Sequence, residues 1–435
     1  MRIIQIFLFA FVLSSFGAAA QSADWNKVQE LIAKRNYALA QLYLSALEVD
    51  NLTPLQIEER QFDLAVCAME LFNEDAAYQL EKYLQEYPTG LFVNDVRFNL
   101  GNLFFREKNY TAAIAKYAQL NTDLLKNDER DMFYFRQGYS YFVEENFEEA
   151  KLSFKELKGV QFKFKDLTKY YVAHIAYLEG NYATALNGFE TLKEVPGIGS
   201  IVRYYIAQIY YLQGRNQELL IFALPLLDSA NTKRSPEIAR LIGDAYYRTN
   251  QFGKSITFLE RFQNATTQKI GRLDKYQLGF AYYQERNLER ASVLFQEVLQ
   301  EEDSLAQYAA YHLADCYMQN NQKGYALNAY KHAASFNFDA NLQEHAAFNH
   351  AKLVYEQEAT YADAVGVFQN YITQFPKSKF LPLVQDYLVK SYSSSSNYIE
   401  ALAALERLGQ LTFEQKQVYQ RMAFFRGLEL SLIHI

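Results

Sequence analysis

Turn and linker residues are scarce in this chain of 435 residues, in which Gly and Pro number only 18 and 7. Aromatic residues make up 16% of it, and helix-forming residues are abundant. Such a chain has ample apolar surface to bury and lacks the composition of a disordered protein. No stretch rich in Pro, Gly and Ser divides it, although length alone suggests roughly two or three globular domains. We therefore expect one continuous structure.

Histidine is also rare: the chain has six, so no Ser–His–Asp order can be read from it. His345 and His350 lie five residues apart, without the Glu that a zinc-protease helix carries between its two ligands. His312, Asp315 and Cys316 could converge on one helical face, but ordinary helix packing explains them better. The sequence therefore predicts no catalytic residues, no metal site and no cofactor, and we do not expect an enzyme.

Positive charge is not in excess, because the formal net charge is −7 and basic residues alternate with acidic ones. The densest basic patch, Lys163–Phe164–Lys165, is offset by Asp166 and Glu156. Proteins that bind nucleic acid concentrate Lys and Arg on one face. Nucleic acid is therefore not expected among the partners.

Long apolar runs are missing except at the N-terminus. Met1–Arg2 gives a positive start, Ile3–Leu13 an apolar core and Ala18–Ala20 a small-residue cleavage site. This order is typical of a signal peptide, here over residues 1–20. An uncleaved membrane anchor is the alternative, but the apolar run is shorter than the roughly 20 residues that span a bilayer. We expect an exported protein that is periplasmic or associated with the outer membrane.

One signature recurs along almost the whole chain: Asn, an aromatic residue, two variable residues, Ala, three variable residues, then an aromatic residue or Leu. Its clearest copies begin at Asn36, Asn109, Asn146, Asn181, Asn287 and Asn397, and degenerate copies lie at Asn73, Gln217, Phe252, Lys323 and Tyr361. The copies follow one another at intervals of 35 to 38 residues. A fixed period of this length is typical of a helical solenoid.

Two further positions keep the same register. Most copies have a small residue nine positions before the aromatic one, as at Gly101 and Gly138, and Phe or Tyr six positions before it, as at Phe104 and Tyr141. Together these positions resemble the tetratricopeptide repeat (TPR) family, from about Trp25 to the C-terminus. The resemblance implies an all-α, right-handed solenoid of about eleven helix–turn–helix repeats. The chain departs from the family in its single Trp, since family members usually carry Trp early in the first helix.

The register also predicts what several residues do. Ala150, Ala185 and Ala291 should be buried where two helices touch, because small residues let helices approach closely. The repeat Asn should end the first helix in the left-handed conformation that Asn tolerates. Cys67 and Cys316 lie about seven repeats apart, and solenoid units contact only their neighbours, so we expect two isolated core thiols.

In the TPR family the first helices line a concave face, and here the register places many aromatic residues on that face. The resemblance predicts these partner-binding residues: Phe98, Phe105, Phe135, Phe142, Tyr170, Tyr177, Tyr205, Tyr247, Tyr276, Tyr283 and Tyr311. Adjacent repeats could instead bury the individual rings as core. For the stripe as a whole we expect a partly exposed aromatic groove, which suits proteins or extended peptides.

Two functions compete on this evidence. The first is a non-catalytic scaffold that binds protein partners, as the resemblance to large exported TPR proteins of the bacterial cell envelope implies. The second is a module that binds glycan or cell-wall polysaccharide, which also stacks on exposed aromatic residues. Polar groups interrupt the stripe only locally, at Arg240, Asp244 and Asp315, and this favours protein. Any association with the outer membrane would then run through the partners.

The array does not finish within the sequence. Residues 418–429 are typical of the first helix of a twelfth repeat, and no polar capping helix follows them. The last six residues, Leu430–Ile435, resemble the in-frame translation of a sequencing-library adapter. We therefore expect a signal peptide at 1–20, a solenoid at 21–429 and an artefactual tail at 430–435. A short natural apolar tail is the alternative.

Overall fold

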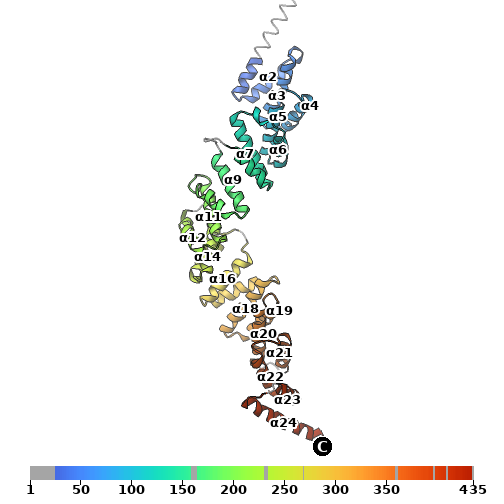
Figure 1. The fold of residues 1–435 in the computed structure, drawn as a ribbon, viewed down its shortest axis with the longest axis vertical. Coiled ribbons are helices and arrows are strands. Elements are labelled where there is room, and N and C mark those ends of the chain that lie inside the picture. Colours follow the sequence, from blue (N-terminus) through green and yellow to red (C-terminus); the bar gives the residue numbers. More distant parts are fainter. Residues whose placement is uncertain are drawn as a thin grey trace, which may run out of the picture. The chain divides into compact units, whose positions relative to one another are not determined.

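The chain folds into helices. The computed structural model describes residues 25–157, 164–229, 234–267, 269–357, 361–394, 397–407 and 410–433, and these form helices and turns but no strand (Figure 1). This confirms the all-α fold that the period predicts. By its internal contacts the chain divides into two compact units, Met1–Arg203 and Tyr204–Ile435.

The first unit begins with a helix whose described part covers residues 25–33. Its other α-helices are α2 (Tyr37–Ala46), α3 (Pro54–Glu70), α4 (Ala76–Glu86), α5 (Val93–Arg106), α6 (Tyr110–Tyr117), α7 (Asn127–Val143), α8 (Phe147–Lys155), α9 (Lys165–Leu178) and α10 (Tyr182–Glu190). Two 3-10 helices, η1 (Val49–Asn51) and η2 (Thr122–Leu124), lie in the longer connections. The helix α11 (Gly199–Leu212) crosses the division between the units.

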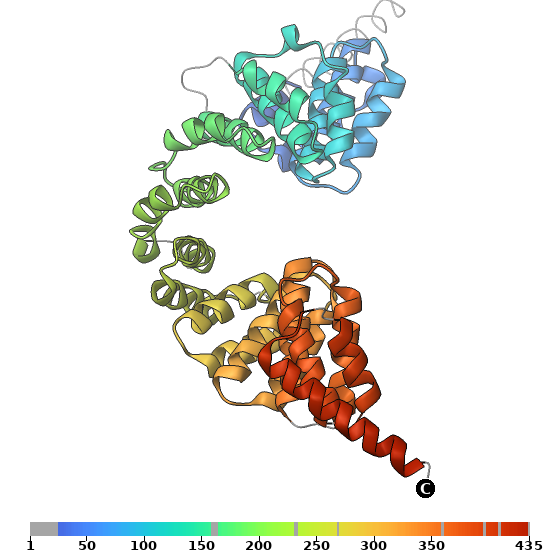
Figure 2. The ribbon, with the colours of Figure 1, turned by 60° about the horizontal axis from the view of Figure 1, so that its bottom comes forward.

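The second unit is also built from consecutive helices joined by short connections. Its α-helices are α12 (Asn216–Ala223), α13 (Leu226–Ser229), α14 (Ser235–Arg248), α15 (Phe252–Ala265), α16 (Arg272–Gln284), α17 (Leu288–Val298), α18 (Ser304–Gln319), α19 (Lys323–Ser335), α20 (Ala340–Glu356), α21 (Tyr361–Gln374), α22 (Leu381–Ser394), α23 (Tyr398–Arg407) and α24 (Phe413–Ile433). Within each unit, helices that follow one another in sequence pack side by side as hairpins (Figure 2). We call α3, α5, α7, α9, α14, α16, α18, α20 and α22 the first helices, and the helix after each one its second helix.

The turn inside each hairpin corrects the expected role of the repeat Asn. In the hairpin of α5 and α6, Lys108 has φ +61° and Asn109 has φ −88°. The Lys108 N–H donates to the Phe105 carbonyl at 3.0 Å and the Asn109 N–H to the Phe104 carbonyl at 2.9 Å, the Schellman pattern. The Asn109 side chain then accepts from the Ala112 N–H at 3.2 Å. The prediction was wrong: Asn caps the second helix, and the residue before it is left-handed.

The same conformation recurs from hairpin to hairpin. Positive φ is found at Arg35, Phe72, Lys108, Glu145, Gly180, Gly214, Asn250, Arg286 and Asn321. Most of these are not glycine, although a left-handed residue with a Cβ costs roughly 1–2 kcal/mol. The two hydrogen bonds of the turn offset this cost in each copy, and a side-chain cap of the second helix adds to them at Asn36, Asn109, Asn181 and Asn287.

Gly180 isolates the backbone cost of this turn, because its φ is +75° and a Cβ added to it would meet no neighbouring atom within 4 Å. We expect Gly180→Ala to lower the free energy of unfolding by about 1 kcal/mol through backbone strain alone. Chemical denaturation measures the change. Lys108→Gly should act in the opposite direction, and a Gly180→Ala variant as stable as the parent would contradict this account.

Small residues on the first helix receive large rings from the second. A Cβ on Gly101 of α5 would lie 2.3 Å from the Tyr117 ring, and one on Gly138 of α7 would lie 2.6 Å from the Phe154 ring. Tyr117 and Phe154 are only 1% and 4% exposed. The small position is therefore the socket into which the second helix inserts its aromatic residue, and the close approach of the two helices depends on it.

The predicted burial of the repeat alanines is confirmed, since Ala150, Ala185 and Ala291 are all 0% exposed. Near Ala185 the helices α9 and α10 approach so closely that a Cβ on Gly188 would lie 2.7 Å from that of Ala173. We expect Ala185→Leu to overpack this contact and to cost roughly 1–3 kcal/mol. Ala183→Leu, at an exposed position of the same helix, is the matched control. A denaturation midpoint that Ala185→Leu leaves unchanged would show that the register is misplaced here.

Both cysteines are isolated core thiols, as predicted. Cys67 and Cys316 are free, fully buried and in different units. Desolvation raises the pKa of each thiol to about 12, so neither is a reactive thiolate at neutral pH.

Some sequence predictions concern residues at the edges of the structure. The signal peptide predicted at 1–20 lies outside the described residues, as do the last two residues of the predicted tail. The helix α24 runs without interruption through the predicted boundary between 429 and 430. None of the described helices combines the length and apolar character needed to span a membrane.

Candidate functional site

A chain of aromatic contacts links successive first helices of the first unit. Phe105 of α5, Tyr110 of α6 and Tyr139 of α7 form a triangle with ring centroids 5.6 to 5.8 Å apart. Tyr139 lies 6.3 Å from Phe142, about one turn further along α7. Phe142 in turn lies 5.5 Å from the ring of His174 in α9. We call these residues, with Tyr177, which lies 6.1 Å from His174, the first ladder.

The second unit repeats this arrangement. Tyr247 of α14, Phe252 of α15 and Phe280 of α16 form a triangle with ring centroids 5.8 to 5.9 Å apart. Phe280 lies 6.0 Å from Tyr283 of the same helix, and Tyr283 lies 5.4 Å from His312 of α18. We call these five residues the second ladder. Both triangles occupy the same repeat positions, so the contact between one first helix and the next is a property of the repeat.

The ladder rings are neither buried nor freely exposed. Phe105, Phe142, Tyr177, Tyr247 and Tyr283 are predicted groove residues, and all are half-buried. Each ring packs one side against its neighbours and leaves part of its surface to solvent. These five predicted residues therefore share one repeat position and one environment.

The other predicted groove residues occupy a different position, which corrects the expected exposure of three of them. Phe98, Phe135 and Tyr170 are 9%, 8% and 9% exposed and belong to the core. Their position faces the second helix of their own hairpin, as when Phe135 lies 6.3 Å from Phe154.

In the second unit the same position is partly covered. Tyr205, Tyr276 and Tyr311 are half-buried. Tyr276 lies 5.7 Å from Phe295 of its second helix, and Tyr311 lies 5.7 Å from Tyr330 of its own. Burial raises the pKa of Tyr276 and Tyr311 above that of a free tyrosine, which keeps both hydroxyls neutral at physiological pH. This position belongs mainly to the hairpin interior.

His312 is an apolar contact of the second ladder. Its ring lies 5.0 Å from Phe280 and 5.8 Å from Phe295, and desolvation lowers its pKa to about 4. The imidazole is therefore neutral at pH 7. Among the residues that the structure describes, no group of three His, Cys, Asp or Glu side chains could hold a metal ion.

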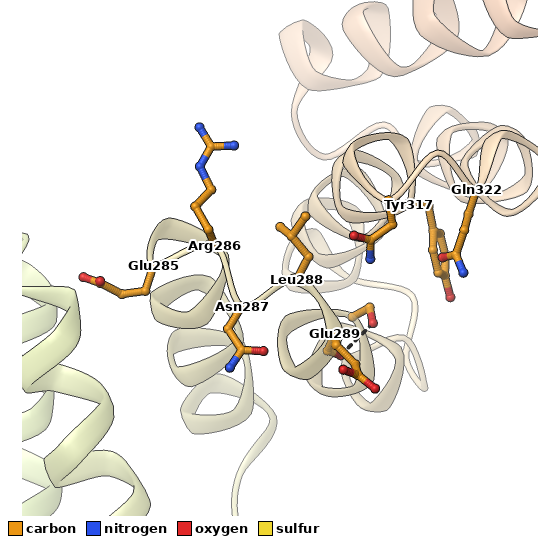
Figure 3. Close-up of a pocket in the computed structure, with 9 residues that line it drawn as sticks. Glu285, Arg286, Asn287, Leu288, Glu289, Tyr317 and Gln322 are labelled. Atoms are coloured by element: carbon orange, nitrogen blue, oxygen red, sulfur yellow. Dashed lines mark hydrogen bonds between the residues drawn. The ribbon is translucent and has the colours of Figure 1, made fainter.

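A polar hollow of about 850 Å³ lies at the hairpin turns of α16–α17 and α18–α19, and none of its lining residues belongs to a ladder. It is lined by Glu285, Arg286, Asn287, Leu288, Glu289, Ser292, Tyr317, Asn320 and Gln322. Figure 3 shows the side chains of Glu285 and Arg286 pointing away from each other. Charges of both signs line the hollow, and nothing in its geometry favours one ligand.

Six ladder members are absent from the predicted binding residues: Tyr110, Tyr139, His174, Phe252, Phe280 and His312. The register does place Tyr139, His174 and Phe280 on the concave face, seven positions before the next repeat Asn. Tyr110 and Phe252 are the repeat aromatic residues themselves. Assigning repeat aromatics to the hairpin turn alone overlooked their contact with the next repeat.

The hairpins, their period and the contacts between first helices define an all-α solenoid that resembles the tetratricopeptide repeat family. Neither a protein-family model nor a curated protein matches the chain. Among the solved structures that resemble it, two are described as TPR proteins.

Three of these structures illustrate the likeness. The C-terminal part of a TPR protein from Cytophaga hutchinsonii is 17% identical, with a TM-score of 0.31 over 67% of this chain and 99% of that one. A TPR protein from Parabacteroides merdae is 15% identical, with a TM-score of 0.38 over 60% and 99%. Yeast Tom70 is 13% identical, with a TM-score of 0.27 over 94% and 96%. At these scores the matches carry no information about partners.

Proposed function

We propose that this chain is a non-catalytic scaffold of the bacterial cell envelope, holding partner proteins or extended peptides on the two aromatic ladders. The observation that carries the proposal is the half-buried state of the ladder rings, which recurs at the three repeat positions of the triangles in both units. Aromatic rings give large contact area at low entropy cost and dominate binding energy in protein interfaces.

The envelope location is supported by sequence alone. Residues 1–20 have the order of a signal peptide, with a basic start, an apolar core and small residues before the cleavage site. An exported scaffold would meet its partners in the periplasm or at the outer membrane. Fusion of residues 1–24 to a reporter that is active only after export tests this location, and a reporter retained inside the cell would refute it.

The binding proposal is tested by truncating one ring in each ladder. We expect Phe105→Ala combined with Tyr247→Ala to reduce partner capture at least tenfold, because central aromatic residues each contribute about 2 kcal/mol in such interfaces. The measurement is quantitative pulldown from envelope extract, with the thermal melting of each variant as a check on folding.

Tyr78→Ala combined with Tyr325→Ala is the matched control. These tyrosines are 68% and 65% exposed on the second helices α4 and α19 and are not ladder members. Equal loss of capture in both double variants would contradict a ladder-specific site. A glycan-array screen in parallel addresses the polysaccharide alternative. That alternative would gain support if the ladder double variant lost binding to glycans while its capture of proteins was unchanged.

A further inference from the structure

An unusual carboxylate lies next to the second ladder. The Asp315 side chain, on the first helix α18, is half-buried and accepts hydrogen bonds from the Tyr283 hydroxyl at 3.4 Å and from the Tyr330 hydroxyl. Tyr311, one turn earlier on α18, packs against Tyr330 with a centroid distance of 5.7 Å. The carboxylate is therefore surrounded by tyrosines and still partly open to solvent.

Asp315 has no cationic partner within the part of the chain that the structure describes, although its counterpart in another repeat has one. Asp244 occupies the same repeat position on α14, is 2% exposed, and pairs with Arg248 four residues later at 2.8 Å. Four residues after Asp315 the chain has Gln319, a neutral side chain. The nearby Arg286 donates to Gln319 instead of to the carboxylate.

A half-buried carboxylate without a cationic partner retains unused capacity to accept hydrogen bonds. A carboxylate offers about four acceptor sites, and the two tyrosine hydroxyls fill two of them. Burial disfavours the charged form, and a positive charge within a few ångströms would favour it. Tyrosine faces also attract cations. The site thus has a negative group, aromatic walls and a route to solvent.

We propose that Asp315 and its surrounding tyrosines recognise a Lys side chain of the partner segment that lies on the second ladder. The ammonium would bond to the free acceptor sites of Asp315, and its aliphatic stem would lie against Tyr283 and Tyr311. This inference rests on the proposed function and names the chemistry of the partner: an extended peptide with a basic residue, complementary to a chain whose formal net charge is −7.

Short capped, Ala-based peptides are the probes, one with a single Lys and one with Nε-acetyl-lysine at the same position. We expect the full chain to bind the Lys peptide about tenfold more tightly than the acetylated one at low ionic strength, as measured by fluorescence anisotropy. Asp315→Asn should remove this preference.

Two further variants separate recognition from folding. Gln319→Arg should also remove the preference, because it supplies within the chain the cation that Arg248 supplies to Asp244. Asp274→Asn should retain it, since that carboxylate in α16 already pairs with Arg240 at 3.5 Å. Melting curves establish that each variant is folded.

The outcomes distinguish the inference from the proposed function. Equal binding of both peptides by the parent chain, or a preference that survives Asp315→Asn, overturns the Lys site and leaves the ladder as a peptide-binding surface. Binding of neither peptide overturns both. Loss of the preference in Asp315→Asn and Gln319→Arg, with Asp274→Asn unaffected, supports the site.

Discussion

Replacing Phe154 with Ala should lower the free energy of unfolding by about 3–5 kcal/mol, the usual cost of removing a buried aromatic ring. The ring is 4% exposed and fills the socket above Gly138. It also stacks on Tyr171 of the next first helix at 6.2 Å. Its removal would thus leave a cavity both inside the hairpin of α7 and α8 and at the contact with α9.

Chemical denaturation followed by circular dichroism measures the effect. Phe413→Ala is the matched control, because that ring is 76% exposed and its loss should change stability by no more than about 0.5 kcal/mol. Gly138→Val should also destabilise the hairpin, because an added Cβ would collide with the Phe154 ring that fills the socket. If Phe154→Ala lowered the free energy of unfolding by less than about 1 kcal/mol, far below the usual cost of such a truncation, the socket would not be what holds the hairpin together.

Replacing Asp63 with Asn should stabilise the protein at pH 8 by roughly 2–4 kcal/mol, as the raised pKa of this carboxyl implies. Asp63 of α3 is 6% exposed and lies near Glu59, and both carboxylates accept from the Gln29 amide, at 2.9 and 3.2 Å. Desolvation is the main cause that raises the Asp63 pKa from 3.8 to about 7. The difference is about three pKa units, and each corresponds to about 1.36 kcal/mol.

The direction follows from proton linkage. Because the folded state holds this proton more tightly than the unfolded state, the contribution of Asp63 to stability is greatest below about pH 4 and falls as pH rises to about 7. Asn cannot ionise, so the advantage of the variant should be large at pH 8 and nearly absent at about pH 4. Urea denaturation at both pH values measures it, with the exposed Glu74→Gln as the control. An equal advantage at both pH values would exclude ionisation of Asp63 as the cause.

The sequence by itself determined the repeat and its interior. A spacing of 35 to 38 residues, small residues nine positions before an aromatic one, and scarce Gly and Pro indicate a helical hairpin as the repeating unit. The burial of Ala150, Ala185 and Ala291 followed from that register alone. These features can be read from the spacing because the residues that contact one another within a hairpin lie within one repeat of the sequence.

The tertiary structure alone decided which aromatic residues keep a free surface. Phe98, Phe135 and Tyr170 share the predicted face with Phe105 and Phe142, yet their own second helices cover them. Similarly, Asp244 and Asp315 share a repeat position, but their burial and partners differ. Periodicity fixes the direction of a side chain from its helix axis, whereas exposure depends on which neighbour reaches it. That neighbour belongs to another helix, and only the packed hairpins specify it.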